Sequence, residues 1–324
     1  PYLETGFGIE NIFRLLRVAE QDAASKGVVG IRDYEMAENI DTWINRFAAG
    51  INGLRVDAGV YPERLRAAID AGWHTGKELP GSAGLGHVGA MKLISDGSLN
   101  TRSAYCSTPY SGIEPLTYGT LSYTPQQIED YMRLATEHGF DIACHAIGDE
   151  ANTIALNAVA ATHAHGSIEH AQMLKPVDIP RFAELGLTAS IQPQHAMDDR
   201  DVITRFWANP AGIPYPFRAL HDTGTTLRMG SDAPVAPLDP WLAISAAVFG
   251  TESSDREPFQ PEQCLDVHTS LAASTATGRD RLASGDPADV VLLDADPYAA
   301  DTPEAMRAMP QHVVMTLLCG ERTY

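Results

Sequence analysis

The chain has 324 residues, of which 44% are hydrophobic and 20% charged, as in an ordinary folded globular protein. Its formal net charge of −19 disfavours nucleic acid or an anionic membrane as a partner, because both are bound by clustered Lys and Arg. No apolar run approaches the roughly 20 residues of a membrane helix, and no basic-then-apolar leader opens the sequence. We therefore expect a soluble, cytoplasmic protein.

Helix-like and strand-like segments alternate along the chain. In chain order, the pattern predicts helix 9–25, strand 27–34, helix 36–49, strand 53–61, helix 62–72 and strand 86–95. A long polar loop, 96–124, follows. The pattern then predicts helix 125–138, strand 140–146, helix 149–161, strand 167–172, helix 177–185, strand 187–192, helix 216–222, strand 226–231 and helices 239–249 and 261–277.

Strands separated by helices, and apolar on both faces, are typical of a parallel sheet covered by helices. We count seven such strands, one fewer than a closed eight-stranded barrel has. The sequence therefore predicts an α/β fold: a TIM-type (β/α) barrel that lacks its first strand, over residues 1–280. Its open side would expose two strand edges, which favour pairing with another chain, so we expect a possible homo-oligomer.

The last part of the chain, residues 281–324, changes character. Residues 285–294 read as a turn followed by a strand, 311–318 as a second strand, and 320–322 as a turn. Because two strands do not form a stable domain, we expect them to be the C-terminal strands of a small β-sandwich whose other strands come from elsewhere.

Four strands of the predicted barrel end near a metal-binding residue. Lys92, His145 and His170 lie at the ends of three successive strands. Asp232 follows the last predicted strand, 226–231, directly after Gly230-Ser231. Barrel active sites are built at the carboxyl ends of several strands, so these side chains should converge. Nitrogen and oxygen ligands in one mouth indicate a divalent metal, with zinc the preferred ion.

Such a metal would lower the pKa of a water molecule and polarise a substrate carbonyl. Asp232 would then be the catalytic residue, taking a proton from water as a general base and returning it to the leaving amine. The four cysteines, which lie far apart without a C-x-x-C pair, indicate neither a disulfide framework nor a zinc knuckle.

Lys92 has two interpretations. A buried ammonium group is costly unless it is paired, so Lys92 either pairs with Asp96 or another carboxylate, or its amine is carboxylated by CO₂ and becomes an anionic ligand. Four residues are candidates for substrate binding: Asp96 and Arg102 after the Lys92 strand, and Gln194 and His195 after the strand that ends at Gln192. Packing behind the mouth is the alternative for the last two, and a surface ion pair for Arg102.

Several segments together carry a resemblance to a known family. They are Lys92–Ser98 (KLISDGS), 145–149 (HAIGD), 168–172 (IEHAQ), Gln192-Pro193 with His195, 230–235 (GSDAPV) and 285–294 (GDPADVVLLD). These segments are similar to the amidohydrolase superfamily, and within it to amidohydrolase family 3, which includes N-substituted formamide deformylase. The resemblance runs over nearly the whole chain.

The resemblance implies roles for four residues. Lys92 matches a carboxylated lysine that bridges two metals, His145 and His170 match the ligands of the second metal, and Asp232 matches the aspartate of the last strand. The family's His-x-His has no counterpart here, because His163-Ala164-His165 falls in a predicted loop between a helix and a strand.

These observations predict a metal-dependent hydrolase that cleaves a C–N bond, an amide, formamide or N-acyl group, in a small-molecule substrate. The rival hypotheses are an inactive, truncated or metal-depleted fragment of such an enzyme, and a binding protein with a vestigial site.

Overall fold

The computed structural model describes residues 8–324, and residues 1–7, where the predicted barrel domain begins, lie outside the described part. Seven strands form one parallel sheet in the order β1-β2-β3-β4-β5-β7-β9. They are β1 (Gly30–Asp33), β2 (Arg55–Val60), β3 (Gly86–Ile94), β4 (Ile142–Ala146), β5 (Gly166–His170), β7 (Thr188–Ile191) and β9 (Thr226–Met229). All seven predicted strands are confirmed, with slightly different bounds.

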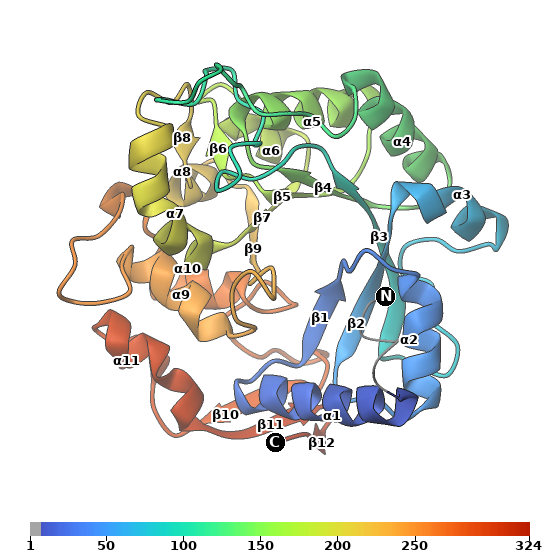
Figure 1. Ribbon diagram of the computed structural model, residues 1–324. Helices are drawn as coiled ribbons and strands as arrows, with labels where there is room; N and C mark the ends of the chain where they lie inside the picture. Colours follow the sequence, from blue (N-terminus) through green and yellow to red (C-terminus); the bar gives the residue numbers. More distant parts are fainter. Residues whose placement is uncertain (1–7) are drawn as a thin grey trace.

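Helices surround the outside of this curled sheet (Figure 1). They are α2 (Asn39–Ala48), α3 (Pro62–Asp70), α4 (Pro125–Glu137), α5 (Asp149–Thr162), α6 (Ile179–Glu184), α7 (Pro193–Phe206), α8 (Phe217–Asp222), α9 (Pro240–Phe249) and α10 (Val267–Ala273). The edge strands β1 and β9 do not pair with each other among the described strands, so the barrel is open on one side. The predicted fold class is confirmed. No helix within residues 8–324 is both long and apolar enough to cross a membrane.

Strand alternation sorts apolar from polar side chains across the sheet. Residues in register on neighbouring parallel strands face the same side. One row, Leu93, Cys144, Ile168, Ala189 and Leu227, is buried in the core beneath the helices. The adjacent positions face the inside of the barrel, and they include His145, Glu169, Ser190 and Arg228 in one register row. The pattern thus directs His145 inward while Cys144 packs outward.

Local signals explain where several helices begin. Thr124 and Gln127 form a capping box at the start of α4, and Pro125 occupies the first helical position. The predicted helix 261–277 is wrong. It divides into a short 3₁₀ turn, Pro261–Gln263, and α10, because Cys264 is extended and Asp266 caps a new helix by accepting a bond from the Thr269 amide.

Two further elements differ from the prediction. The sequence pattern predicts no helix over residues 193–206, yet they form α7 with Pro193 in its first turn. The predicted turn at 320–322 contains a third strand, β12 (Glu321–Arg322), which pairs antiparallel with β11 (Val313–Leu318). Together with β10 (Val290–Leu293) these strands form a three-stranded sheet. The expected C-terminal strands of a small sheet are therefore present, and the expectation that further strands come from elsewhere stays a prediction.

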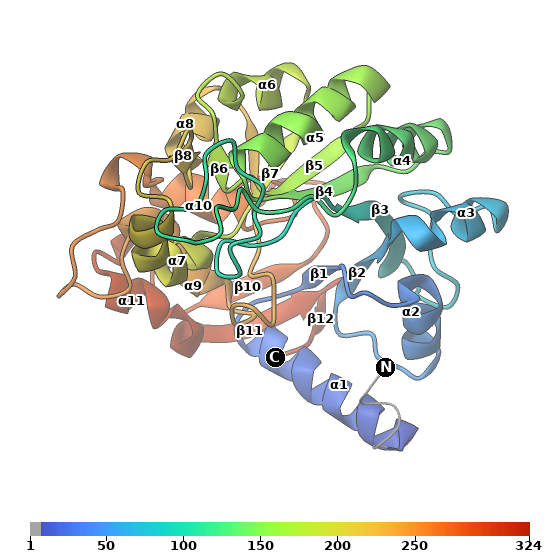
Figure 2. The ribbon, with the colours of Figure 1, turned by 45° about the horizontal axis from the view of Figure 1, so that its top comes forward.

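The small sheet lies against the first helix, α1 (Ile9–Ser25), as Figures 1 and 2 show. The buried Thr316 hydroxyl donates to the Ala24 carbonyl at 2.7 Å. On β2, Arg55 forms an ion pair with Asp289, with Nε and Oδ2 2.5 Å apart, and the Cys319 amide donates to Asp289 at 2.8 Å. The carboxylate of Asp289, just before β10, thus links strand β2 of the barrel to the residue that follows β11 in the small sheet.

These contacts set the ionisation of Asp289. Burial alone raises its pKa, but the bonds from Arg55 and from the Cys319 amide outweigh that effect, so the pKa lies below its usual value. A depressed carboxyl pKa stabilises the folded state above the unfolded-state value, and the contribution is lost as the pH falls through the folded-state value.

We predict that Asp289→Asn lowers the free energy of unfolding by about 1–2 kcal/mol at pH 7, because the charged acceptor of two bonds is lost. Below about pH 4 the difference from the parent should shrink, because Asp289 becomes protonated there. Urea unfolding between pH 3 and 7 measures this. The control is Asp294→Asn, which removes an exposed partner of His312. A constant difference at every pH would contradict the prediction.

Candidate metal centre

The predicted ligands lie at the carboxyl ends of neighbouring strands. Lys92, His145 and His170 belong to β3, β4 and β5, which are adjacent in the sheet, and β9, which precedes Asp232, lies on the far side of β7 from β5. His145 is in register with Glu169, and Ala146 with His170. The sheet therefore brings side chains from four strands to one mouth, as expected for a barrel.

A compact cluster of possible metal ligands contains a histidine that the sequence predicts only as a mouth residue. One ligand atom from each of His170, His195 and Asp232 lies within 4.8 Å of the other two. The rings of His170 and His195 are stacked with centroids 5.7 Å apart. His195 reaches this place from the first turn of α7, directly after β7. Pro193, at the start of a helical pattern, is the sequence signal for the helix that carries His195.

Both histidines of this cluster have a buried nitrogen without a hydrogen-bond partner within the described residues. The two atoms are His170 Nδ1 and His195 Nε2. An unsatisfied buried polar atom costs about 1–3 kcal/mol, so unpaired atoms rarely collect in one place without a ligand. Imidazole nitrogens beside a carboxylate fit a divalent transition metal, and these residues pass that test.

His170 is held in the form that binds metals. Burial, and then the neighbouring His145, Lys92 and His195, lower the pKa of His170 well below its usual value. The ring is therefore neutral at pH 7 and keeps a lone pair for a cation.

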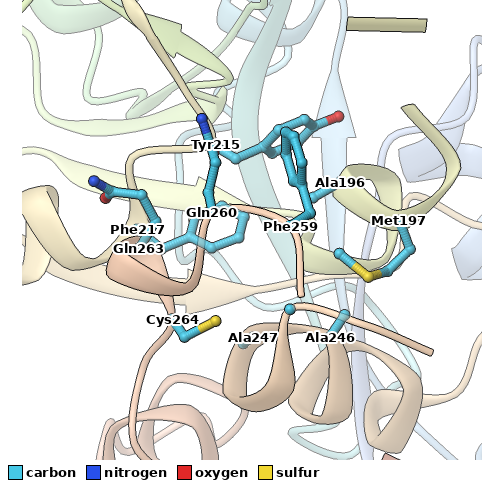
Figure 3. A pocket seen from close by; sticks show the side chains of 11 residues that line it. Ala196, Met197, Tyr215, Phe217, Ala246, Ala247, Phe259, Gln260, Gln263 and Cys264 are labelled. Carbon is cyan, nitrogen blue, oxygen red and sulfur yellow. The ribbon is translucent and has the colours of Figure 1, made fainter. Parts of the chain in front are cut away.

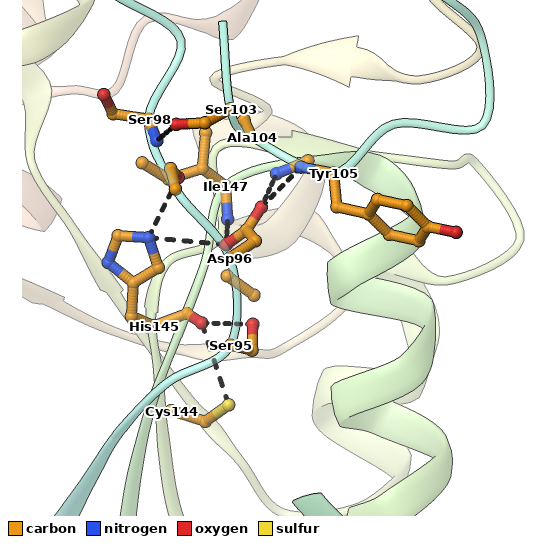
Figure 4. Close-up of polar contacts among 12 residues, drawn as sticks. Ser95, Asp96, Ser98, Ser103, Ala104, Tyr105, Cys144, His145 and Ile147 are labelled. Carbon is orange, nitrogen blue, oxygen red and sulfur yellow. Dashed lines mark hydrogen bonds and ion pairs between the residues drawn. The ribbon is translucent and has the colours of Figure 1, made fainter. Parts of the chain in front are cut away.

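His145 lies beside His170, with ring centroids 4.5 Å apart. Its Nε2 is 3.3 Å from Asp96 Oδ1 and 3.2 Å from the Gly97 carbonyl oxygen, as Figure 4 shows. Both neighbours are acceptors, so the proton belongs on Nε2 and the lone pair on Nδ1. A carboxylate that fixes the tautomer in this way usually accompanies a metal-binding histidine.

Asp96 itself is fully buried. Its carboxylate accepts bonds from the backbone amides of Tyr105, Ile147 and Gly148 at 2.9–3.1 Å (Figure 4). A Cβ on Gly148 would lie 2.0 Å from the Tyr105 carbonyl oxygen, so only glycine allows this approach. Asp96 was predicted to bind substrate, but its oxygens face these amides and His145, so it positions His145 instead.

Lys92 is 8% exposed, and its Nζ lies 4.9 Å from the centre of the Tyr34 ring. Within the described residues no carboxylate comes within 4.0 Å of it, so the pairing with Asp96 is not formed. The reason is geometric, since residues four apart on an extended strand are separated by about 13 Å. The buried amine is left beside an aromatic face.

The backbone around the cluster adopts an uncommon conformation. His170, Ala171 and Asp232 have φ angles of 72°, 45° and 54°, in the left-handed region. Non-glycine residues of this kind cost about 1–3 kcal/mol each and tend to collect at functional sites. At Asp232 the left-handed turn follows Gly230-Ser231 and leaves the carboxylate exposed at the mouth.

Two other predicted site residues, Arg102 and Gln194, form no hydrogen bond with the cluster of His170, His195 and Asp232 among the described residues. Arg102 is exposed, and its guanidinium lies 5.5 Å from the centre of the Phe206 ring. Gln194 is buried, where it donates to Glu252 at 2.8 Å and accepts from Arg307 at 3.4 Å. Gln194 thus ties α7 to the segments packed against its other side.

A buried carboxylate on α7 holds the long loop in place. Asp199 accepts bonds from Asn100 at 2.7 Å, from Gln172 at 2.9 Å and from the Tyr215 hydroxyl at 2.6 Å. The same loop is fixed again where the Ser107 amide donates to Asp149 at 2.9 Å.

Behind α7, a small pocket between α7 and α9 is lined mainly by apolar side chains such as Met197 and Phe259 (Figure 3). None of the predicted site residues lines it, so it belongs to the packing of α7.

A parallel (β/α) sheet that carries imidazole and carboxylate groups at the ends of its strands is an arrangement on which barrel metal sites are built. The chain belongs to the family described as "Amidohydrolase family", whose model matches residues 9–324. The predicted resemblance is therefore confirmed.

Individual relatives agree with this assignment. The putative amidohydrolase YtcJ of Bacillus subtilis (strain 168) is 29% identical over 88% of this chain and 57% of its own length. The N-substituted formamide deformylase of Arthrobacter pascens is 25% identical over 67% of this chain and 42% of its own length. The chain therefore spans about half the length of these curated relatives.

A solved structure is also similar. The crystal structure of an uncharacterized metal-dependent hydrolase from Pyrococcus horikoshii OT3 has a TM-score of 0.81 and 25% sequence identity. The match covers 96% of this chain and 63% of that chain. Nearly the whole of the present fold thus recurs in a longer protein.

We predict that Asp199→Asn lowers the free energy of unfolding by about 1–3 kcal/mol, because the amide nitrogen of the new side chain opposes donors and leaves one of them unpaired. Thermal unfolding measures the loss. The control on the same helix is Asp201→Asn, whose exposed carboxylate pairs with Arg256 and should contribute at most about 1 kcal/mol. Equal effects of the two substitutions would contradict the role given to Asp199.

Proposed function

We propose that this protein is a metal-dependent hydrolase that cleaves a C–N bond, in an amide, formamide or N-acyl group, with water as the nucleophile. The observation that carries the proposal is the cluster of His170, His195 and the exposed Asp232, in which each histidine also has one buried nitrogen without a hydrogen-bond partner in the described residues. The residues predicted to hold the metal are Lys92, His145, His170 and Asp232. Membership of the amidohydrolase family supports the bond class.

The residues would divide the work as follows. A divalent cation, zinc in this proposal, supplies the charge that activates water and polarises the substrate carbonyl. Asp232, exposed at the mouth, takes the proton from the attacking water and passes it to the leaving nitrogen. Asp96 keeps the His145 ring oriented, and it keeps the proton on Nε2.

The environment of Lys92 supports carboxylation. An ammonium group that is 8% exposed and lacks a carboxylate within ion-pair distance in the described residues is costly. In the proposed modification the neutral amine adds to CO₂, forming one N–C bond and releasing one proton. The product is an anion, which changes Lys92 from a cation into a metal ligand.

The substrate is proposed from chemistry and from a relative. One relative is a formamide deformylase, and that name supports an N-acyl or N-formyl compound as the substrate class for this chain. We also propose a cytoplasmic location, which the four free cysteines support, and assembly into a homo-oligomer through the open edges of the sheet.

We predict that stripping the metal with a chelator abolishes hydrolysis of an N-formyl or N-acyl amine, and that added Zn²⁺ restores it. Asp232→Asn should lower kcat by about 10²–10⁴-fold, because the proton acceptor is lost. Release of the amine, followed by chromatography, measures both effects. The matched control is Asp222→Asn on α8, where the carboxylate is exposed.

Two outcomes favour the rival hypotheses. A protein that binds no metal and releases no amine from any substrate is an inactive fragment. One that binds substrate and metal but releases no amine is a binding protein with a vestigial site.

We predict that Lys92→Ala loses activity and that short carboxylic acids partly restore it, because a free carboxylate can occupy the place of the carbamate. Rates measured with and without acetate or propionate test this. The comparison variant is Lys92→Arg, which keeps the positive charge but is not carboxylated, and full activity in it would contradict the proposal.

A further inference from the structure

His195 stands apart from the ligands that strand ends supply. It lies in the first turn of α7, where its backbone amide donates to the Gln192 carbonyl at 3.1 Å. The side chain is 8% exposed. Because the helix begins directly after β7, its first turn covers the mouth of the barrel and carries His195 over His170.

The described surroundings of His195 leave one of its ring nitrogens without a hydrogen-bond partner. Its Nε2 is buried and has no hydrogen-bond partner within the described residues, and the same is true of His170 Nδ1 on the facing ring. Two stacked imidazole rings, each with a buried nitrogen that lacks a partner, are explained by a cation that binds both residues. Asp232 adds a negatively charged oxygen to the same group.

We propose that His195 is a metal ligand in addition to His145 and His170. In this proposal His170, His195 and Asp232 form a cation centre that does not need Lys92. The inference rests on the proposed metal dependence and adds both a ligand and a preference for one type of ion. Two imidazoles and one carboxylate select a divalent transition metal, such as Zn²⁺ or Co²⁺, over Mg²⁺ or Ca²⁺, which prefer oxygen ligands.

The distances are compatible with this centre. Ligand atoms bonded to zinc at about 2.0–2.1 Å in a tetrahedron lie about 3.4 Å apart. The three atoms now lie within 4.8 Å of one another, so side-chain rotations of roughly 1 Å bring them to bonding distance. Lys92 remains outside the group, with its Nζ against the Tyr34 ring.

Cobalt binding by the full chain tests the proposal. The protein is stripped with a chelator, titrated with Co²⁺ and followed by its visible absorption, and bound metal is counted by mass spectrometry after gel filtration. His195→Ala should weaken Co²⁺ binding by more than about 100-fold, since loss of an outer partner of a ligand already costs about 10–100-fold. Lys92→Ala should keep one bound Co²⁺, because His170, His195 and Asp232 remain, and excess Mg²⁺ should not displace it.

Controls separate a ligand from a structural residue. His165→Ala removes an exposed histidine from the loop before β5 and should leave Co²⁺ binding unchanged. His195→Gln keeps a polar side chain of similar reach, so it gives a folded variant, judged by circular dichroism, if His195→Ala does not fold. This variant should also lose affinity and shift the Co²⁺ absorption band.

The opposite results overturn the inference. If His195 variants bind Co²⁺ within tenfold of the parent with the same spectrum, His195 is not a ligand. If Lys92→Ala loses all bound Co²⁺, the centre is not independent of Lys92. Failure of the proposed function is distinct, because a chain that binds Co²⁺ through His195 but hydrolyses no amide keeps this inference and loses the other.

Discussion

The buried carboxylate of Asp96 is the point on which the mouth of the barrel depends. It accepts backbone amides from the long loop at Tyr105 and from the start of α5 at Ile147 and Gly148, and it also orients His145. A charge enclosed in this way is stable only when its hydrogen bonds are complete, so the surrounding segments must take one arrangement. The position of His145 therefore depends on two things: the strand that carries it, and the way the long loop meets the start of α5.

Strand alternation supplies the second constraint. A parallel register puts every second residue of β3, β4 and β5 on the same side, which turns Leu93 and Cys144 toward the helices and His145 and Glu169 toward the inside. This periodicity is visible in the sequence, so the seven strands, the fold class and the inward direction of His145 could be predicted from it. His170 is in register with Ala146, so alternation alone would turn it away from His145, and its left-handed φ of 72° departs from strand geometry. Asp232 could be placed as the residue that follows the last predicted strand.

What the sequence did not reveal depends on contacts between distant segments. The sequence pattern places His195 only at the mouth, because it does not predict α7 after Gln192-Pro193, although Pro at the first helical position is a signal for a helix there. The role of Asp96 depends on the backbone amides of Tyr105, Ile147 and Gly148, which meet at its carboxylate only in the folded chain. The division of residues 261–277 required the cap formed by Asp266, a local hydrogen bond that outweighs helical periodicity.

The attachments of the long loop affect how a substrate reaches the centre. The loop is held at Asn100 by Asp199, at Tyr105 by Asp96 and at Ser107 by Asp149, and all three carboxylates are buried. Lifting this segment would break all of these bonds together and expose three buried side chains. We therefore expect the loop to act as a fixed wall of the mouth and not as a lid. In the proposed hydrolase, the shape of this wall would then decide which substrates are admitted.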